Sequence, residues 1–215
     1  MQKAVIGETF FDYLIYLPND YDGIKKYPLV LYLHGAGERA NTSEDIFLLK
    51  RFGPPKLCDL NDYDAIIVSP QVKQPWTWSS FPEKLKDFLE EIIKKYSVDE
   101  NAVSITGVSM GCFGMYQVLM DYPNLFSGAV AVCGGGMDWR SDTIKDLPLR
   151  IYHGKEDWAV SCVYAQAMYE KLLYYGAKKV ELNIIPNMGH NVWDVVYEDT
   201  DALSWLIRQR NDDKI

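Results

Sequence analysis

Short apolar runs rich in β-branched and aromatic residues alternate with longer segments of helical periodicity along most of the chain. Such runs predict strands, and periodic segments predict helices. The expected strands are residues 10–18, 27–35, 64–70, 102–106, 126–134, 147–154 and 179–186, and the expected helices are residues 83–96, 110–122, 162–175 and 199–208. Repeated strand–helix alternation predicts an α/β fold with a mostly parallel central sheet and helices on both faces.

The helix boundaries are marked by particular residues. Pro123 ends the helix that precedes it, because proline lacks an amide hydrogen and disrupts a helical turn. Gly176 fits the C-terminal cap of the helix over 162–175. The cluster 41–43 (Asn-Thr-Ser) also fits a glycosylation sequon, but we interpret it as a helix cap.

The 215 residues suit one domain, 1–215, since no repeat, low-complexity tract or linker interrupts the pattern. A net charge of -8 argues against a nucleic-acid or anionic-membrane partner. No apolar stretch approaches the roughly 18 residues of a spanning helix, and the N-terminal residues do not resemble a signal peptide, so a cytoplasmic location is expected. The four cysteines lack C-x-x-C spacing, which predicts reduced thiols and no metal site.

The candidate chemistry lies in the loops after the strands, which form the ligand crevice of a parallel sheet. Residues 107–111 read G-x-S-x-G between a strand and a helix, with Ser109 at the centre. Small neighbours permit the strained turn that exposes a nucleophilic serine, whereas the alternative is a simple turn that lets the helix lie close to the sheet. We predict Ser109 as a nucleophile.

A serine nucleophile needs a base and an acid that orients the base. Asp157, after the strand that ends near His153, is the predicted acid, with Asp138 and Asp142 as rivals. His190 is the predicted base, because among the three histidines only it lies on a late loop. The resulting order of serine, acid and histidine is that of α/β-hydrolases.

An early glycine loop, residues 35–40, has two interpretations. It matches G-x-G-x-x-G/A and would permit a dinucleotide-binding oxidoreductase, but the next strand does not end in the required acid. The preferred interpretation is an oxyanion loop, in which the amides of Ala36 and Met110 hold the developing negative charge and Gly37 substitutes for Ala36 if needed. His34 is expected to support this loop.

Four segments, "LHGAGER", "GVSMGCFG", "HGKEDWAV" and "GHNVWD", together resemble the small serine esterases of the α/β-hydrolase superfamily. The branch in question includes predicted peptidases, phospholipase/carboxylesterase-like proteins and feruloyl esterases. The resemblance implies a Ser109, Asp157 and His190 triad without metal or organic cofactor. Ala40 departs from the glycine that such relatives often carry, which bears on loop shape. The segment 134–146 is too short for a lid domain, so an open site is expected.

The predicted function is hydrolysis of carboxylic esters, on small molecules that include carbohydrate-linked or phenolic acyl esters. Trp78, Met137, Trp158 and Trp193 are the expected substrate-binding residues, because they cluster in the site loops together with Trp76 and Trp139. Filling of the loop-side core is an equally good interpretation of these residues. A serine peptidase and a non-catalytic binding scaffold are the alternative functions, and a homodimer is left open.

Overall fold

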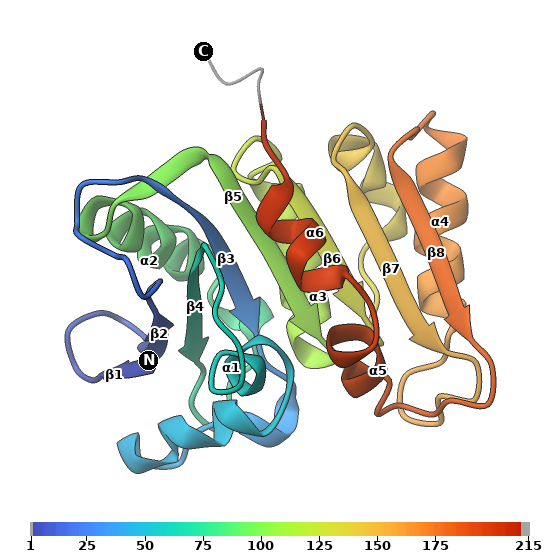
Figure 1. Cartoon of the computed structure of the whole chain (residues 1–215). Coiled ribbons are helices and arrows are strands. Elements are labelled where there is room, and N and C mark those ends of the chain that lie inside the picture. The colour runs from blue at the N-terminus through green and yellow to red at the C-terminus, as the bar shows by residue number, and fades with distance from the viewer. Residues whose placement is uncertain (1, 212–215) are drawn as a thin grey trace.

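The computed structural model describes residues 2–211, which build a single eight-stranded sheet of order β1-β2-β4-β3-β5-β6-β7-β8 (Figure 1). The strands β1 and β2 pair antiparallel with each other, β2 pairs antiparallel with β4, and every later pair is parallel. Their bounds are β1 Gln2–Val5, β2 Asp12–Tyr16, β3 Tyr27–Leu33, β4 Ile66–Gln71, β5 Val98–Val108, β6 Gly128–Val132, β7 Leu149–Gly154 and β8 Val180–Ile185. The predicted mostly parallel sheet is confirmed.

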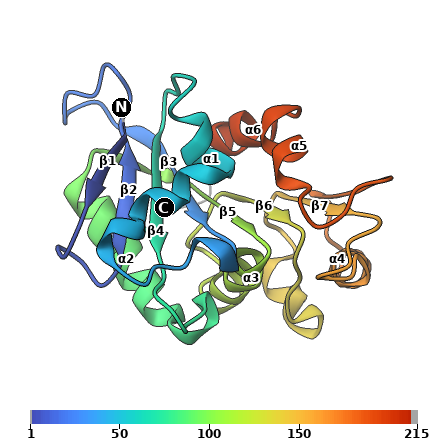
Figure 2. The ribbon, with the colours of Figure 1, turned by 90° about the horizontal axis from the view of Figure 1, so that it is seen from below.

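Helices cover both faces of the sheet. In the view from below, α2, α3 and α4 lie on one side of the strands, and α1, α5 and α6 lie on the other (Figure 2). The α-helices are α1 Gly53–Leu57, α2 Pro82–Lys95, α3 Met110–Asp121, α4 Val163–Tyr174, α5 Trp193–Glu198 and α6 Ala202–Arg208, and the 3₁₀ helices are η1 Ala36–Glu38, η2 Ser43–Arg51, η3 Trp78–Ser80 and η4 Asp138–Ile144. The connection between β6 and β7 carries only η4, so no lid domain stands there.

The sheet separates two hydrophobic clusters because successive side chains of a strand point to opposite faces. On β3, Leu29, Leu31 and Leu33 join the cluster that includes the apolar stripe of α2. Val30 and Tyr32 of the same strand join the cluster that holds residues of α5 and α6. A strand buried on both faces is therefore apolar at consecutive positions, as the sequence of β3 shows.

Two local features differ from the sequence prediction, and a third agrees with it. The strand β1 was not predicted, since its four residues are too few to show alternation. The helix expected over 199–208 is α6, which begins only at Ala202, and the separate helix α5 before it was not predicted. The cap expected over 41–43 is confirmed, because Thr42 and Asp45 form a capping box at the start of η2.

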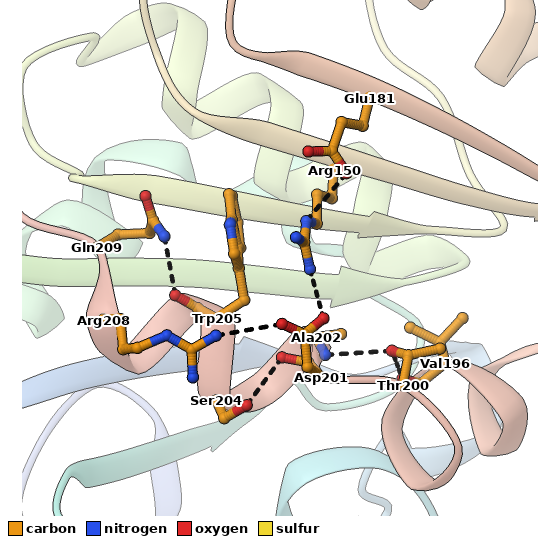
Figure 3. A network of polar contacts seen from close by, with 10 residues as sticks. All are labelled: Arg150, Glu181, Val196, Thr200, Asp201, Ala202, Ser204, Trp205, Arg208 and Gln209. Atoms are coloured by element: carbon orange, nitrogen blue, oxygen red, sulfur yellow. Dashed lines mark hydrogen bonds and ion pairs between the residues drawn. The ribbon is translucent and has the colours of Figure 1, made fainter.

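A polar network anchors α6 to the edge of the sheet (Figure 3). The Arg150 guanidinium on β7 lies 3.1 Å from Glu181 Oε2 on β8 and 2.6 Å from Asp201 Oδ1. It also lies over the indole ring of Trp205, 4.6 Å from the ring centroid. Asp201 in addition binds Arg208, with 3.1 Å between the charged atoms. The network fixes the position at which α5 ends and α6 begins.

No helix within residues 2–211 has both the length and the apolar character needed to cross a bilayer. The carboxyl ends of the parallel strands β3 to β8 share one edge of the sheet, and the loops that leave this edge carry the residues described next.

Candidate functional site

Ser109 occupies a strained corner between β5 and α3. Its φ is 52° and its ψ is -116°, a conformation that is costly for a residue with a side chain. The amide of Ser109 donates to Val132 O of β6 at 2.9 Å, and its carbonyl accepts from the Cys112 amide at 2.9 Å. These bonds on both sides of the residue hold the strained backbone in place.

Gly107 and Gly111 are required by close approach of backbone to backbone. A Cβ atom on Gly107 would overlap the carbonyl of Gly111, and one on Gly111 would overlap the carbonyl oxygen of Leu33. The G-x-S-x-G pattern thus has a steric cause, because the start of α3 passes directly over the ends of β3 and β5.

The structure brings three predicted residues into one hydrogen-bonded row. Ser109 Oγ lies 2.9 Å from His190 Nε2, and His190 Nδ1 lies 2.7 Å from Asp157 Oδ2. Since the carboxylate can only accept, His190 Nδ1 carries the proton, and its Nε2 is free to accept the Ser109 hydroxyl. The rivals Asp138 and Asp142 lie in η4, and the carboxylate bound to His190 is that of Asp157.

Asp157 is completely buried at its side chain and remains a good acceptor. Its Oδ1 receives the amides of Ala159 and Val160, each at 2.9 Å. Burial acts to raise the pKa of this carboxyl group, but the hydrogen bonds from His190 and from the Val160 and Ala159 amides together lower the pKa below its ordinary value. An ionised carboxylate therefore faces the imidazole.

Residues 34–38 lie beside the serine. A Cβ on Gly35 would stand 3.8 Å from Ser109 Cβ. Ala36 begins η1 and Met110 begins α3, and an amide at the first position of a helix has no carbonyl partner within that helix. Both amides can therefore donate to an oxyanion. The predicted pair is available for this role.

His34 supports this loop from beneath. Its Nε2 accepts the Val72 amide at 3.1 Å, so its Nδ1 donates to Gly35 O, at 2.6 Å. Burial lowers the pKa of His34 to about 4, which keeps the ring neutral. The side-chain amide of Gln71 donates to Glu38 O at 2.8 Å and holds the other end of the loop.

A pocket of about 350 Å³ opens over Ser109 and His190. Its walls include the loop 35–38 and three aromatic residues, Tyr32, Phe52 and Trp193. Trp193 packs edge-on against the His190 ring, with 5.6 Å between the ring centroids. It also packs against Phe52 in a tilted arrangement, with 5.2 Å between the centroids. Sequence reasoning missed Tyr32 and Phe52, because one is an ordinary strand residue and the other precedes α1 without any motif.

The four expected substrate-binding residues lie in different surroundings. Trp193 lines the pocket, whereas Trp78 is only 1% exposed and donates its indole N–H to His34 O in the core. Met137 precedes η4 and packs against the core, away from the pocket lining. Trp158 is 86% exposed, and a Cβ on Gly189, next to His190, would lie 3.9 Å from its Cδ1. Trp78 thus has a structural position beneath the loop 34–38, and Trp158 lies beside Gly189, next to His190.

Within the described range 2–211, no three side chains of histidine, cysteine, aspartate or glutamate are grouped so as to hold a metal ion. The four cysteines are free thiols. The chemistry available at this edge of the sheet is that of a serine, an imidazole, a carboxylate and backbone amides.

Comparison with known proteins assigns the chain to a family. The profile of the phospholipase/carboxylesterase family matches residues 63–202, and the chain belongs to this family. It has the α/β-hydrolase fold, with a TM-score of 0.78 to a thermostable esterase that is 26% identical and aligns over 98% of this chain. A feruloyl esterase module from Clostridium thermocellum, solved with sinapinate, has a TM-score of 0.70 at 16% identity, over 97% of this chain and 88% of that one.

Dipeptidyl-peptidase 5 of Porphyromonas endodontalis is 22% identical over 247 residues and aligns with 93% of this chain. The chain spans about a third (34%) of the length of that curated relative and 63% of the thermostable esterase chain.

Proposed function

We propose that the chain hydrolyses carboxylic esters, with Ser109 as nucleophile, His190 as general base and Asp157 as the acid that orients His190. The observation that carries the proposal is the continuous row from Ser109 Oγ to His190 at 2.9 Å and from His190 to Asp157 at 2.7 Å. Membership of the phospholipase/carboxylesterase family supports ester rather than other chemistry. We also propose that residues 1–215 act as one hydrolase domain.

The reaction follows from the hydrogen-bond directions. His190 Nε2 takes the Ser109 proton as Oγ attacks the ester carbonyl carbon, and the Ala36 and Met110 amides stabilise the oxyanion. When the carbonyl reforms, the ester C–O bond breaks and His190 gives its proton to the departing alkoxide oxygen. Water then attacks the acyl-enzyme, again losing a proton to His190, and releases the acid and free Ser109.

The acyl group is proposed to occupy the pocket lined by Phe52, Trp193 and the loop 35–38, and the alcohol part to extend toward the exposed Trp158. An apolar pocket with aromatic walls suits an aromatic or medium-length acyl chain. An exposed indole beside the base suits the face of a sugar ring. Carbohydrate-linked or phenolic acyl esters therefore fit this site, and the likeness in fold to a feruloyl esterase module solved with sinapinate agrees with them.

A serine peptidase of the same fold is the second candidate, favoured by the similarity to dipeptidyl-peptidase 5. Amides have the poorer leaving group, and the pocket holds both a buried carboxyl, Glu38, and a cation, Arg51, rather than one dominant charge. The same residues would perform both reactions.

The test is turnover of a matched panel: p-nitrophenyl acetate and butyrate, methyl ferulate, an acetylated sugar and a dipeptidyl p-nitroanilide. The proposal predicts hydrolysis of the esters, with kcat for p-nitrophenyl butyrate reduced by about 10⁴-fold or more in Ser109→Ala. Faster turnover of the anilide than of every ester would favour the peptidase. Activity of Ser109→Ala equal to that of the wild type would rule out Ser109 as the nucleophile.

A further inference from the structure

A second imidazole lies beside the acid of the row. His153 is the penultimate residue of β7, four residues before Asp157, and its Nε2 lies 3.1 Å from Asp157 Oδ2. The same Nε2 lies 2.8 Å from Val160 O. The side chains of His153 and Asp157 are both 0% exposed. Oδ2 is therefore shared between two histidines, and water does not reach it from the His153 side.

The proton on His153 can be assigned from its neighbours. Both atoms near Nε2, a carboxylate oxygen and a carbonyl oxygen, can only accept, so Nε2 must carry hydrogen. It donates this hydrogen to Val160 O, and Asp157 Oδ2 lies close beside it, 3.1 Å from Nε2. Nδ1 is buried and has no hydrogen-bond partner within the part of the chain that the structure describes. A charged ring would bury an unpaired Nδ1–H there, which is costlier than burying a bare lone pair. His153 thus acts as a neutral donor rather than as a second cation.

We propose that His153 is a positioning residue for the proposed ester hydrolysis, acting through Asp157. Its N–H ties the loop 157–160 to β7 through Val160 O, and the positive end of the same N–H dipole lies close to Asp157 Oδ2. It also takes up part of the negative charge on Oδ2. His190 therefore faces a weaker anion than it would without His153, which keeps its imidazole easier to deprotonate.

The other titratable groups around this cluster are few. His190 approaches from the loop after β8, and Cys133 approaches from the end of β6. Burial and neighbouring Cys112 raise the pKa of the Cys133 thiol, with a further contribution from the charge of Asp157, so the thiol stays neutral. Lys155 and Glu156 of the same loop are exposed to solvent. Among these groups, His190 binds Asp157 Oδ2 at 2.7 Å and His153 lies 3.1 Å from it.

Three variants separate positioning from packing. His153→Phe keeps an aromatic ring of similar size but removes the donor, and His153→Met is a second donor-free variant in case the first does not fold. His153→Gln places an amide N–H near the original Nε2. The expected loss in kcat/KM is about tenfold or more for the donor-free variants, with recovery to within about threefold in His153→Gln.

The deciding measurement is the titration of His190 in the full chain, monitored by the NMR signals of its ring nitrogens. Without the His153 donor, Asp157 Oδ2 holds more charge, the protonated ring of His190 is stabilised, and the midpoint should rise by about half a pH unit or more. The acid limb of the pH profile of kcat/KM should move to higher pH by the same amount. His153→Gln should return both midpoints to their wild-type positions. An unmoved midpoint in His153→Phe and His153→Met, or no recovery in His153→Gln, would overturn the inference.

Failure of the proposed function can be distinguished from failure of the inference about His153. The NMR titration needs no substrate, and His34 does not interfere because burial lowers its pKa to about 4. A wild-type chain that hydrolyses no ester would contradict the proposed function, while the shift in the His190 midpoint still decides whether His153 acts on Asp157.

Discussion

Gly111 lies against the carbonyl oxygen of Leu33, so closely that no Cβ atom fits between them. This contact joins the start of α3 to the end of β3, and it sets the distance from Ser109 to the loop that holds Ala36. The geometry of the site therefore depends on a glycine that makes no polar contact with substrate.

Gly111→Ala should destabilise the protein and move Ser109 out of line. Overpacking of this kind costs about 1–3 kcal/mol, which corresponds to a fall of about 2–12 °C in Tm for a chain of this size. Calorimetry with an ester assay measures both effects. Gly37→Ala is the matched stability control, because open space surrounds that position; an equal loss of Tm in both variants would contradict the steric explanation.

Asp157→Asn should lower kcat by about 10³–10⁴-fold with little change in fold, because an amide can donate to His190 Nδ1 and favour the wrong tautomer. Steady-state kinetics on p-nitrophenyl butyrate measures the effect. Asp138→Asn and Asp142→Asn are the controls and should remain close to wild type. A large loss in either control, with Asp157→Asn active, would assign the acid to η4.

The kcat/KM profile should fall on the acid side with unit slope through one group, the His190 imidazole. Protonation of His190 Nε2 removes the lone pair that accepts the Ser109 proton, so activity is lost as pH falls. Asp157 contributes no second step there, because its pKa is held below its ordinary value and its proton binds only at lower pH. A flat profile down to pH 4 would contradict the role of His190.

The contribution of Asp157 to folding stability is also lost as pH falls, as activity is. A carboxyl group whose pKa is lower in the folded state stabilises that state above the pKa of the unfolded chain, about 3.9. This stabilisation is lost as pH falls through the folded value, so acid unfolding should begin below the pH at which activity has already disappeared.

Phe52→Ala should change acyl preference rather than catalysis. Removing one wall of the pocket should lower kcat/KM for aromatic and medium-length acyl esters by about tenfold and leave acetyl esters within about threefold. Phe47→Ala is the control, since Phe47 is exposed on η2 and outside the pocket lining. Equal losses on acetyl and aromatic esters would show that this pocket does not hold the acyl group.

Local sequence patterns predict much of this architecture. The parallel strands follow from apolar runs such as β3, and the contact between Ser109, His190 and Asp157 follows from placing three motifs at the ends of parallel strands. The start of α6 at Ala202 could not be predicted, because Asp201, the residue before it, is bound by Arg150, which is distant in sequence. Tyr32 and Phe52 were missed for a related reason: a pocket wall needs only bulk in the right place, which leaves no spacing to recognise. Trp78 looked like a site residue, yet its partner is a backbone carbonyl in the core.

The most direct measurement is mass spectrometry of the intact chain after treatment with a fluorophosphonate, followed by peptide mapping. An activated serine alone should react, so the account predicts one adduct, located on Ser109, with labelling abolished in Ser109→Ala and slowed in Asp157→Asn. An adduct on another serine, or undiminished labelling of Ser109→Ala, would contradict it.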